Sequence, residues 1–398
     1  MKEKPTSHRL RNGATPRVAV LVDTSSSWGR RIIRGIDNYT LTHGPWQLFL
    51  EPRGIEDVTG LPPGWKGDGI IARVGNARMA EKIAALRIPI INVSSIVLPK
   101  NNFPRVSNDL TVSAQMALAH FQDRGFRNFA YFSLIGLSYV SAQREAFVKA
   151  LTAAGHECSV YSVKPRKGAE PDWNLDLAEL GAWLESLPKP VGVLTWNASS
   201  SREIVYACQM ADLLVPEEVA VLSGTDDDVL CECVHPAISG IMAAAEKVGH
   251  QAAELLDHMM HTKRRLSPPQ IVVPPQEIVT RQSTDTLAVR DPALVKALSF
   301  IRNNAAHPIH VAEVARHAGV SRRILELRFM QHLKRSPATE IRRCHLDRAK
   351  RLLLETQMPI PDVAQAAGFG SPEYLAYVFK AETGESPLRY RRSLKRGG

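Results

Sequence analysis

Short apolar runs alternate with helical patterns along the first two thirds of the chain, and this alternation limits the fold more than any other feature. Strands are predicted at 17–22, 46–50, 68–72, 88–93, 128–133, 158–163, 191–195 and 219–224, and helices at 30–40, 77–86, 110–123, 141–154, 175–187, 200–212 and 243–261. Such alternation predicts mostly parallel sheets with helices on both faces. A stretch of about 280 residues divides most naturally into two such lobes.

Polar and aromatic residues follow the carboxyl ends of several predicted strands, where ligands of open parallel sheets bind. These candidate ligand-binding residues are Asp23, Trp28, Arg73, Asn108, Asp109, Trp196, Asn197 and Asp226. Carboxylates, amides and guanidinium groups match sugar hydroxyls, and Trp offers an apolar face to ring C–H groups. Each residue also has a purely structural alternative. Asp109, for example, is equally well placed to cap the helix predicted at 110–123.

The last quarter of the chain carries nearly all of the net charge of +10. Residues 291–398 hold 19 Lys and Arg against 10 Asp and Glu, whereas the first 290 residues hold 31 against 30. This asymmetry indicates a nucleic-acid-binding domain attached to a nearly neutral one. The plainer alternative is a solvated basic face.

The basic region contains two helix-turn-helix patterns. In the pattern at 360–391, Pro361 suits a first helical turn, Gly368 ends that helix, and Ser371 is placed to cap the next one. An ordinary helical hairpin has the same outline, so the pattern alone does not decide between the two. A helix-turn-helix unit would lay its second helix, here called the reading helix, in the major groove of double-stranded DNA.

The other unit combines a helix at 311–318 with a reading helix at 322–332, and a long helix at 339–356 joins the two units. This arrangement fits two successive major-groove segments about 34 Å apart. Outward positions on the reading helices are the DNA-binding candidates: Arg322, Arg323, Glu326, Leu327, Glu373, Ala376, Tyr377 and Lys380. Arg suits guanine and Glu suits cytosine, whereas Lys380 is better placed for a phosphate.

Several other classes of protein are disfavoured by the sequence. The five cysteines are scattered without zinc-site spacing, so we expect reduced thiols, no metal and no cofactor in a cytoplasmic protein. No run of 18 apolar residues is present, which predicts no membrane association. Residues 1–16 are charged, without the apolar segment of a secretory signal, and are predicted to be a disordered tail. Since nucleophile-elbow, phosphate-loop and metalloprotease motifs are absent, an enzyme is not expected.

Both parts of the chain resemble known families. The residues Ile360, Ala364, Gly368-Phe369, Phe379-Lys380, Gly384, Pro387 and Tyr390-Arg391 resemble the C-terminal signature of the AraC/XylS transcription regulators. Residues 17–284 resemble the periplasmic-binding-protein-like effector domain of the LacI/GalR repressors, notably at 67–71, 221–226 and 271–284. The resemblance implies four parts: a tail at 1–16, a sugar-binding effector domain at 17–284, a linker at 285–291 and an AraC-type DNA-binding domain at 292–398.

The two modules in this order resemble the family of xylose operon regulators. The resemblance implies a monosaccharide effector, with D-xylose as the first candidate, and places Arg144, Asn197 and Asp226 at positions that contact the sugar. It also implies activation of transcription, although the sequence itself leaves activation and repression open. A mechanism in which sugar binding closes the lobes and changes how the DNA-binding domains are presented predicts a homodimer on two half-sites, and RNA polymerase is a further expected partner. Another pentose, a polyol or a sugar acid stays open as the effector. A vestigial pocket in a regulator controlled by a protein partner stays open as well.

Overall fold

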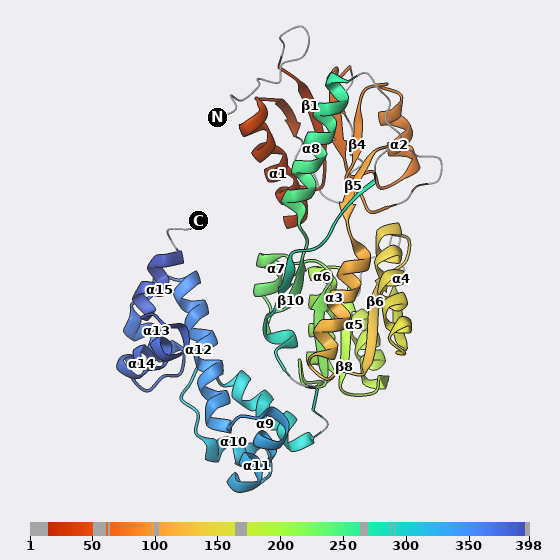
Figure 1. The fold of residues 1–398 in the computed structure, drawn as a ribbon. Coiled ribbons are helices and arrows are strands. Elements are labelled where there is room, and N and C mark those ends of the chain that lie inside the picture. The colour runs from red at the N-terminus through yellow and green to blue at the C-terminus, as the bar shows by residue number, and fades with distance from the viewer. Residues whose placement is uncertain are drawn as a thin grey trace. The chain divides into compact units, whose positions relative to one another are not determined.

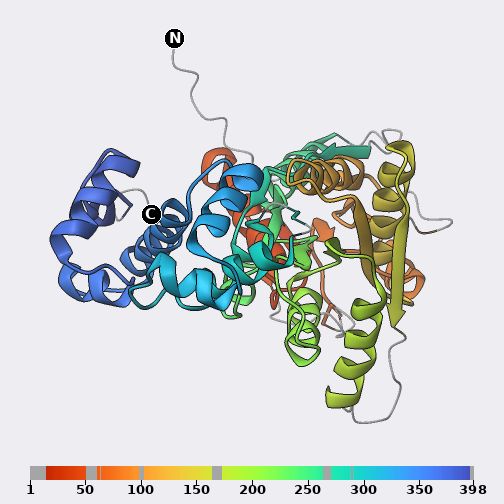
Figure 2. The same ribbon diagram turned by 90° about the horizontal axis from the view of Figure 1, so that it is seen from below.

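The computed structural model describes residues 15–394 except 51–60, 63, 97, 99–102, 164–172, 263–269, 287 and 290. The tail predicted at 1–16 therefore falls almost entirely outside the described residues. The chain divides into two compact units, Met1–Thr286 (unit 1) and Leu287–Gly398 (unit 2). Unit 1 contains the sheets, and the described part of unit 2, drawn in cyan to blue, is built of helices (Figures 1 and 2).

The described residues of unit 1 form two six-stranded sheets. The first has the order β11-β5-β4-β3-β1-β2 and the second the order β12-β10-β9-β8-β6-β7. The strands of the first sheet are β1 (Arg17–Leu21), β2 (Gln47–Leu50), β3 (Gly69–Ala72), β4 (Ile90–Asn92), β5 (Arg105–Asn108) and β11 (Gln270–Val273). Those of the second are β6 (Asn128–Leu134), β7 (Cys158–Val163), β8 (Val191–Thr195), β9 (Val219–Ser223), β10 (Ser239–Met242) and β12 (Glu277–Val279). We call the first sheet with its helices the N-lobe and the second the C-lobe.

The strands pair in parallel in both sheets, except that β12 runs antiparallel to β10. The prediction of two lobes with parallel sheets is therefore confirmed. The sequence did not predict β5, β10, β11 and β12. These strands have only three or four residues, and β5 reads Arg-Val-Ser-Asn, so none forms a long apolar run.

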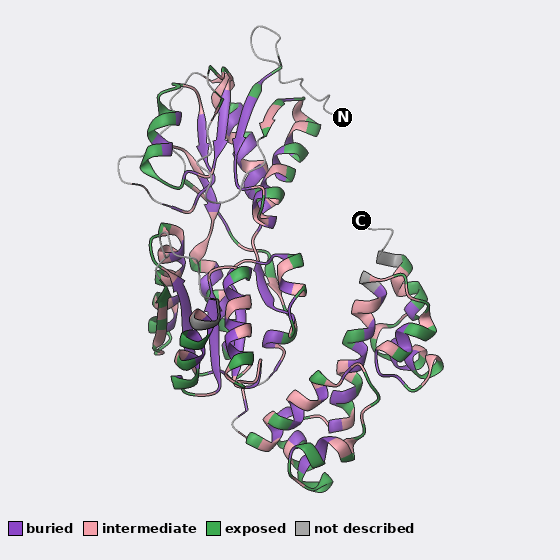
Figure 3. Ribbon diagram, turned by 180° about the vertical axis from the view of Figure 1, so that it is seen from behind, coloured by how far each residue is buried: buried purple, intermediate pink, exposed green. Residues whose placement is uncertain are grey.

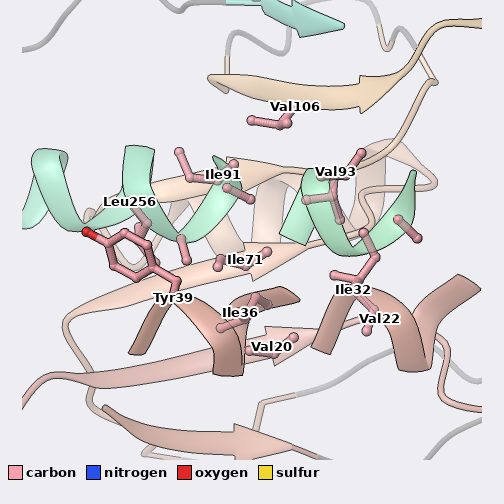
Figure 4. Close-up of a cluster of buried hydrophobic side chains, with 14 of the residues drawn as sticks. Val20, Val22, Ile32, Ile36, Tyr39, Ile71, Ile91, Val93, Val106 and Leu256 are labelled. Carbon is pink, nitrogen blue, oxygen red and sulfur yellow. The ribbon is translucent and has the colours of Figure 1, made fainter. Parts of the chain in front are cut away.

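In the N-lobe, α1 (Ser27–His43) and α8 (Ala245–His261) cover one face of the sheet, and α2 (Ala77–Ala84) packs on the other. Figure 4 shows Ile36 of α1 and Leu256 of α8 among the valines and isoleucines of the strands. Helix α1 begins three residues before the predicted start, because the side chain of Ser26 accepts a hydrogen bond from the Gly29 N–H and caps the helix there.

In the C-lobe, α3 (Leu110–Gln122) and α4 (Ser138–Ala153) lie on one face of the sheet. On the other face lie α5 (Trp173–Ser186), α6 (Ala198–Met210) and the short α7 (Asp228–Glu232). Side chains of β6 alternate between the faces: the Phe129 ring lies 6.3 Å from Phe121 of α3, whereas Phe132 packs in the cluster under α5 and α6. The inner strands of both sheets are buried, whereas the edge strands β2, β7, β11 and β12 are largely half-buried or exposed, and the helices expose their outer sides (Figure 3).

Unit 2 consists of α9 (Pro292–Asn303), α10 (Val311–His317), α11 (Arg322–Leu333), α12 (Pro337–Glu355), α13 (Ile360–Ala366), α14 (Pro372–Thr383) and α15 (Pro387–Leu394). The two predicted helix-turn-helix units are α10–α11 and α13–α14, and α12 joins them. Ile341 of α12 lies in the core of the first unit, whereas Leu346 and Leu353 lie in the core of the second. The joining helix thus belongs to both cores. No helix among the described residues has the length and apolar character needed to cross a membrane.

Candidate ligand pocket and nucleic-acid interface

Three chain segments cross between the N-lobe and the C-lobe: β5 to α3, β10 to α8, and β11 to β12. The segments are hydrogen-bonded to one another, since the Asp109 N–H donates to Val273 O at 2.8 Å and the Gln276 N–H donates to Met242 O at 2.8 Å. Asn108, Ala243 and Pro275, one residue from each crossing, line a pocket. The pocket therefore lies at the hinge between the lobes, a common position for small-molecule sites.

The pocket encloses about 950 Å³ of empty space, counted with the open solvent at its mouth. Five of the predicted residues line it together: Trp28, Arg73, Asn108, Trp196 and Asn197. Residues that the sequence analysis missed also line it, including Tyr139 and Gln143. Tyr139 lies in the first turn of α4, which begins three residues before its predicted start. A predicted helix that began at Ser138 would have included Tyr139.

Unsatisfied polar atoms mark this site. Nε1 of Trp28 and Oδ1 of Asn108, both on lining residues, are buried without a hydrogen-bond partner in the described part of the chain. Oδ2 of Asp23, which follows β1 and lies outside the lining, is buried without a partner as well. The other carboxylate oxygen of Asp23 accepts from the N–H and the hydroxyl of Ser25, at 2.9 and 2.6 Å. Leaving buried polar atoms unpaired is costly, so such atoms require a partner such as a bound ligand or an ordered water. The unpaired donor and the unpaired acceptor of the lining suit hydroxyl groups, which both donate and accept.

Arg73 holds its guanidinium against aromatic rings from both lobes. Its Cζ lies 5.4 Å from the ring centroid of Trp28 in the N-lobe and 4.8 Å from that of Tyr139 in the C-lobe. Burial raises the pKa of the Tyr139 hydroxyl, and the charge of Arg73 opposes that rise. Among the described residues that line the pocket, Arg73 is the single charged side chain. The stacking fixes a positive charge in the pocket wall.

Four predicted ligand residues lie outside the pocket lining, namely Asp23, Asp109, Arg144 and Asp226. Asp109 caps α3, because its Oδ1 accepts from the N–H groups of Thr111 and Val112, and this confirms the capping alternative. The guanidinium of Arg144 lies 3.7 Å from the carboxylate of Glu145. Asp226 is buried and binds Arg281. Asn197 does line the pocket, but its Oδ1 also caps α6 by accepting from the Ser200 N–H at 2.8 Å.

Arg281 connects the C-lobe with the last residues of unit 1. Its Nη1 donates to Oδ1 of Asp226 at 2.6 Å and to Ile238 O at 3.0 Å, and its Nη2 donates to Glu232 at 3.2 Å. Asp226 and its neighbour also meet the N-lobe: the Ser27 hydroxyl donates to Asp226 O at 3.1 Å, and the Ser27 N–H donates to Asp227 at 3.2 Å. Asp226 therefore takes part both in the contact between the lobes and in the ion pair with Arg281 near the end of unit 1.

The residues that follow Arg281 are anchored in the C-lobe. The Ser283 hydroxyl donates to Val221 O at 2.6 Å, and the Thr284 hydroxyl lies 2.8 Å from Nε2 of His120. Burial lowers the pKa of His120 to about 3. The Arg-Gln-Ser-Thr pattern of the sequence is thus the segment that fastens the end of unit 1 to its sheet.

The two reading helices of unit 2, α11 and α14, begin in the same way. Ser321 and Ser371 cap them by accepting from the N–H groups of Ile324 and Tyr374. The outward candidates Arg323, Leu327, Glu373, Tyr377 and Lys380 are exposed. Ala376 is half-buried, and Arg322 pairs with Glu326 at 2.9 Å. Arg328, also on α11, supports the fold, because its guanidinium binds Asp291, the N-cap residue of α9, at 2.6 Å.

Groupings of three or more metal-binding side chains do not occur within the described ranges. All five cysteines are free thiols, as the sequence analysis predicted.

Known families match both units. Residues 17–112 match the XylR N-terminal domain, residues 118–284 match a periplasmic binding protein-like domain, and residues 314–393 match a helix-turn-helix domain. A solved LacI-family regulator from Enterococcus faecium with bound ribose shares the fold of unit 1, with a TM-score of 0.54 at 17% identity.

Some relatives match nearly the whole chain. The xylose operon regulatory protein of Escherichia coli (strain K12) is 26% identical over 382 residues, covering 94% of this chain and 96% of that protein. The protein of the same name from Haemophilus influenzae (strain Rd) is 27% identical over 385 residues, covering 94% and 98%. The solved structure of the xylose-binding transcription activator xylR has a TM-score of 0.80 at 26% identity and covers 96% of this chain and 98% of that one. The chain shares both modules of these regulators, in the same order.

Proposed function

We propose that this chain, a homologue of the xylose operon regulators along nearly its whole length, is a DNA-binding transcription regulator that responds to D-xylose. The observation that carries the proposal is the hinge pocket with its unpaired donor on Trp28 and its unpaired acceptor on Asn108. Such a pocket matches a polyhydroxylated ligand, and Trp28 and Trp196 provide apolar faces for its C–H groups. The chain is a regulator and not an enzyme.

Sugar binding would act by closing the lobes around the hinge. In the closed form the effector domain and its dimer partner hold the DNA-binding units in an arrangement that binds DNA. Because the sugar favours the closed form, it shifts an existing equilibrium towards that DNA-competent state. Arg281 supports this mechanism, because it joins the aspartate at the lobe contact to the segment that leads into unit 2. In this proposal the protein works in the cytoplasm as a homodimer that activates transcription through RNA polymerase.

A thermal-unfolding panel of pentoses, hexoses and sugar acids tests the effector. D-xylose at a hundred times its dissociation constant should add about 2.7 kcal/mol to the free energy of unfolding. Asn108→Ala should abolish that gain, because it removes the unpaired acceptor from the pocket wall. Arg144→Ala is the comparison: loss of the gain with this variant would make Arg144 a ligand residue despite its place outside the pocket lining.

Arg73 favours a second candidate, an acidic sugar. Its guanidinium is held in the pocket wall, and among the described lining residues no carboxylate opposes it. D-xylonate stabilising the protein where D-xylose does not, with the effect removed by Arg73→Gln, would establish the acidic effector and reject the neutral one. A protein that binds duplex DNA but is stabilised by no sugar would point to control by a protein partner.

A further inference from the structure

Each reading helix exposes large apolar side chains, and the most exposed of them stands at the same position on both helices. Leu327 on α11 is 66% exposed and Tyr377 on α14 is 73% exposed, and each follows its capping serine by six residues. The buried positions correspond as well, since Leu325 and Leu375 stand four residues after the cap and are both 0% exposed. The two helices therefore present their side chains in the same register.

These two side chains point away from the cores. Leu327 lies midway between the buried Leu325 and Phe329, and Tyr377 lies midway between the buried Leu375 and Phe379. Residues two apart on a helix lie about 200° apart around its axis, so the midpoint of a buried pair faces outward. Single exposed apolar side chains are common on protein surfaces, but recurrence at one position of two helix-turn-helix units indicates a shared role.

Polar neighbours surround Leu327 on α11, which also exposes Ile324 and Met330 to a smaller extent. Arg322 and Glu326 bind each other at 2.9 Å, and Arg328 binds Asp291. Arg323 is exposed beside Leu327 and is free to reach a guanine or a phosphate. The surroundings favour DNA as the partner of this face, because residues 291–398 carry a net charge of +9.

We propose that Leu327 and Tyr377 each contact the C5-methyl group of a thymine in the major groove. That methyl group is the apolar feature that base edges present there, and it distinguishes thymine from the other bases. The preferred DNA then carries one such thymine in each of two segments about one helical turn apart. This inference rests on the proposed function only in that the protein binds duplex DNA.

The test begins by enriching duplexes from a random pool with the full-length protein and the effector. Each thymine of the best duplex is then replaced by deoxyuridine, which keeps base pairing and removes only the methyl group. The intact protein should lose about fourfold in affinity at one position in each segment, the value of burying one methyl-sized group. Leu327→Ala should bind thymine and deoxyuridine equally at its position, and Tyr377→Ala should do so at the other.

Leu388→Ala is the matched control, because Leu388 is 46% exposed on α15, outside the reading helices, and should keep both sensitivities. Indifference of the intact protein to every deoxyuridine replacement would overturn the inference, and so would unchanged sensitivities in Leu327→Ala. A change in self-association of Leu327→Ala, with both sensitivities kept, would assign this face to a protein partner and likewise overturn it. Failure to enrich any duplex would contradict the proposed function itself.

Discussion

His120 is buried beside the anchored end of unit 1, where its Nε2 lies 2.8 Å from the Thr284 hydroxyl. Burial lowers its pKa from 6.5 to about 3, and the charge of Arg124 adds to this effect. The folded protein therefore keeps this imidazole neutral at pH values where the unfolded chain protonates it. Because the unfolded state then binds more protons, folding is disfavoured at acid pH. The contribution of the buried neutral imidazole to the free energy of unfolding is therefore fully present above pH 6.5 and is lost as the pH falls towards 3.

The resulting expectation is acid sensitivity of unit 1. Between pH 7 and pH 5 this one group should lower the free energy of unfolding by roughly 2 kcal/mol. Urea unfolding across that range measures the loss, and His120→Gln should flatten the dependence because glutamine does not titrate. An equally steep dependence in His120→Gln would show that other groups cause it.

Single residues also show how far sequence reasoning reaches. Trp28, Arg73 and Asn108 could be predicted as pocket residues, because the rule for strand ends depends only on strand order. Asp109 obeys the same rule, yet its carboxylate turns to the N–H groups of α3. Which of two neighbouring side chains faces the pocket depends on local backbone direction, and residue types do not encode it.

Among the elements, α1 and α8 pack unusually closely through glycines. A Cβ at Gly249 would lie 2.1 Å from the carbonyl oxygen of Ile32, and one at Gly35 would lie 2.0 Å from that of Glu246. Both obstacles are helix backbone, which has no rotamer to change. The two helices of the N-lobe therefore approach at a distance that only glycine permits at these positions.

Gly249→Ala should consequently force the helices apart and lower the free energy of unfolding by about 2–3 kcal/mol, the usual cost of overpacking. Gly75→Ala is the matched control in the same lobe, since a Cβ there meets nothing within 4 Å, and it should change stability by no more than about 0.5 kcal/mol. Thermal or urea unfolding distinguishes the two variants. Equal stability of both would mean that the helices accommodate the methyl group without cost.

Elements with strong local signals were predictable, and those stabilised mainly by their neighbours were not. The reading helices carry capping serines and buried leucine and phenylalanine side chains at helical spacing, and their predicted starts agree with the structure. By contrast, β11 and β12 are short edge strands that bring the chain back across the hinge. Their pairing with β5 and β10 depends on tertiary contacts, which no short pattern records.

At the scale of the whole molecule, unit 1 connects its pocket to its last residues through few side chains. Thr225 lines the pocket, the next residue Asp226 accepts the hydroxyl of Ser27 from the N-lobe, and Arg281 holds the carboxylate of Asp226. A change in the angle between the lobes would alter the contact between Ser27 and Asp226. Any effect on Asp226 then reaches Arg281, at the beginning of the segment that joins the two units.

Arg281→Lys tests whether this connection carries the response. Lysine keeps a positive charge beside Asp226 but loses the planar fork that also binds Glu232 and Ile238 O. The variant should bind the effector within about threefold of the original affinity, because Arg281 does not line the pocket. Its DNA affinity should depend much less on the effector. The factor by which the effector changes the DNA affinity, typically about 5–150-fold in allosteric proteins, should fall towards one. DNA-binding titrations with and without effector measure that ratio, and an unchanged ratio would place the connection elsewhere in the hinge.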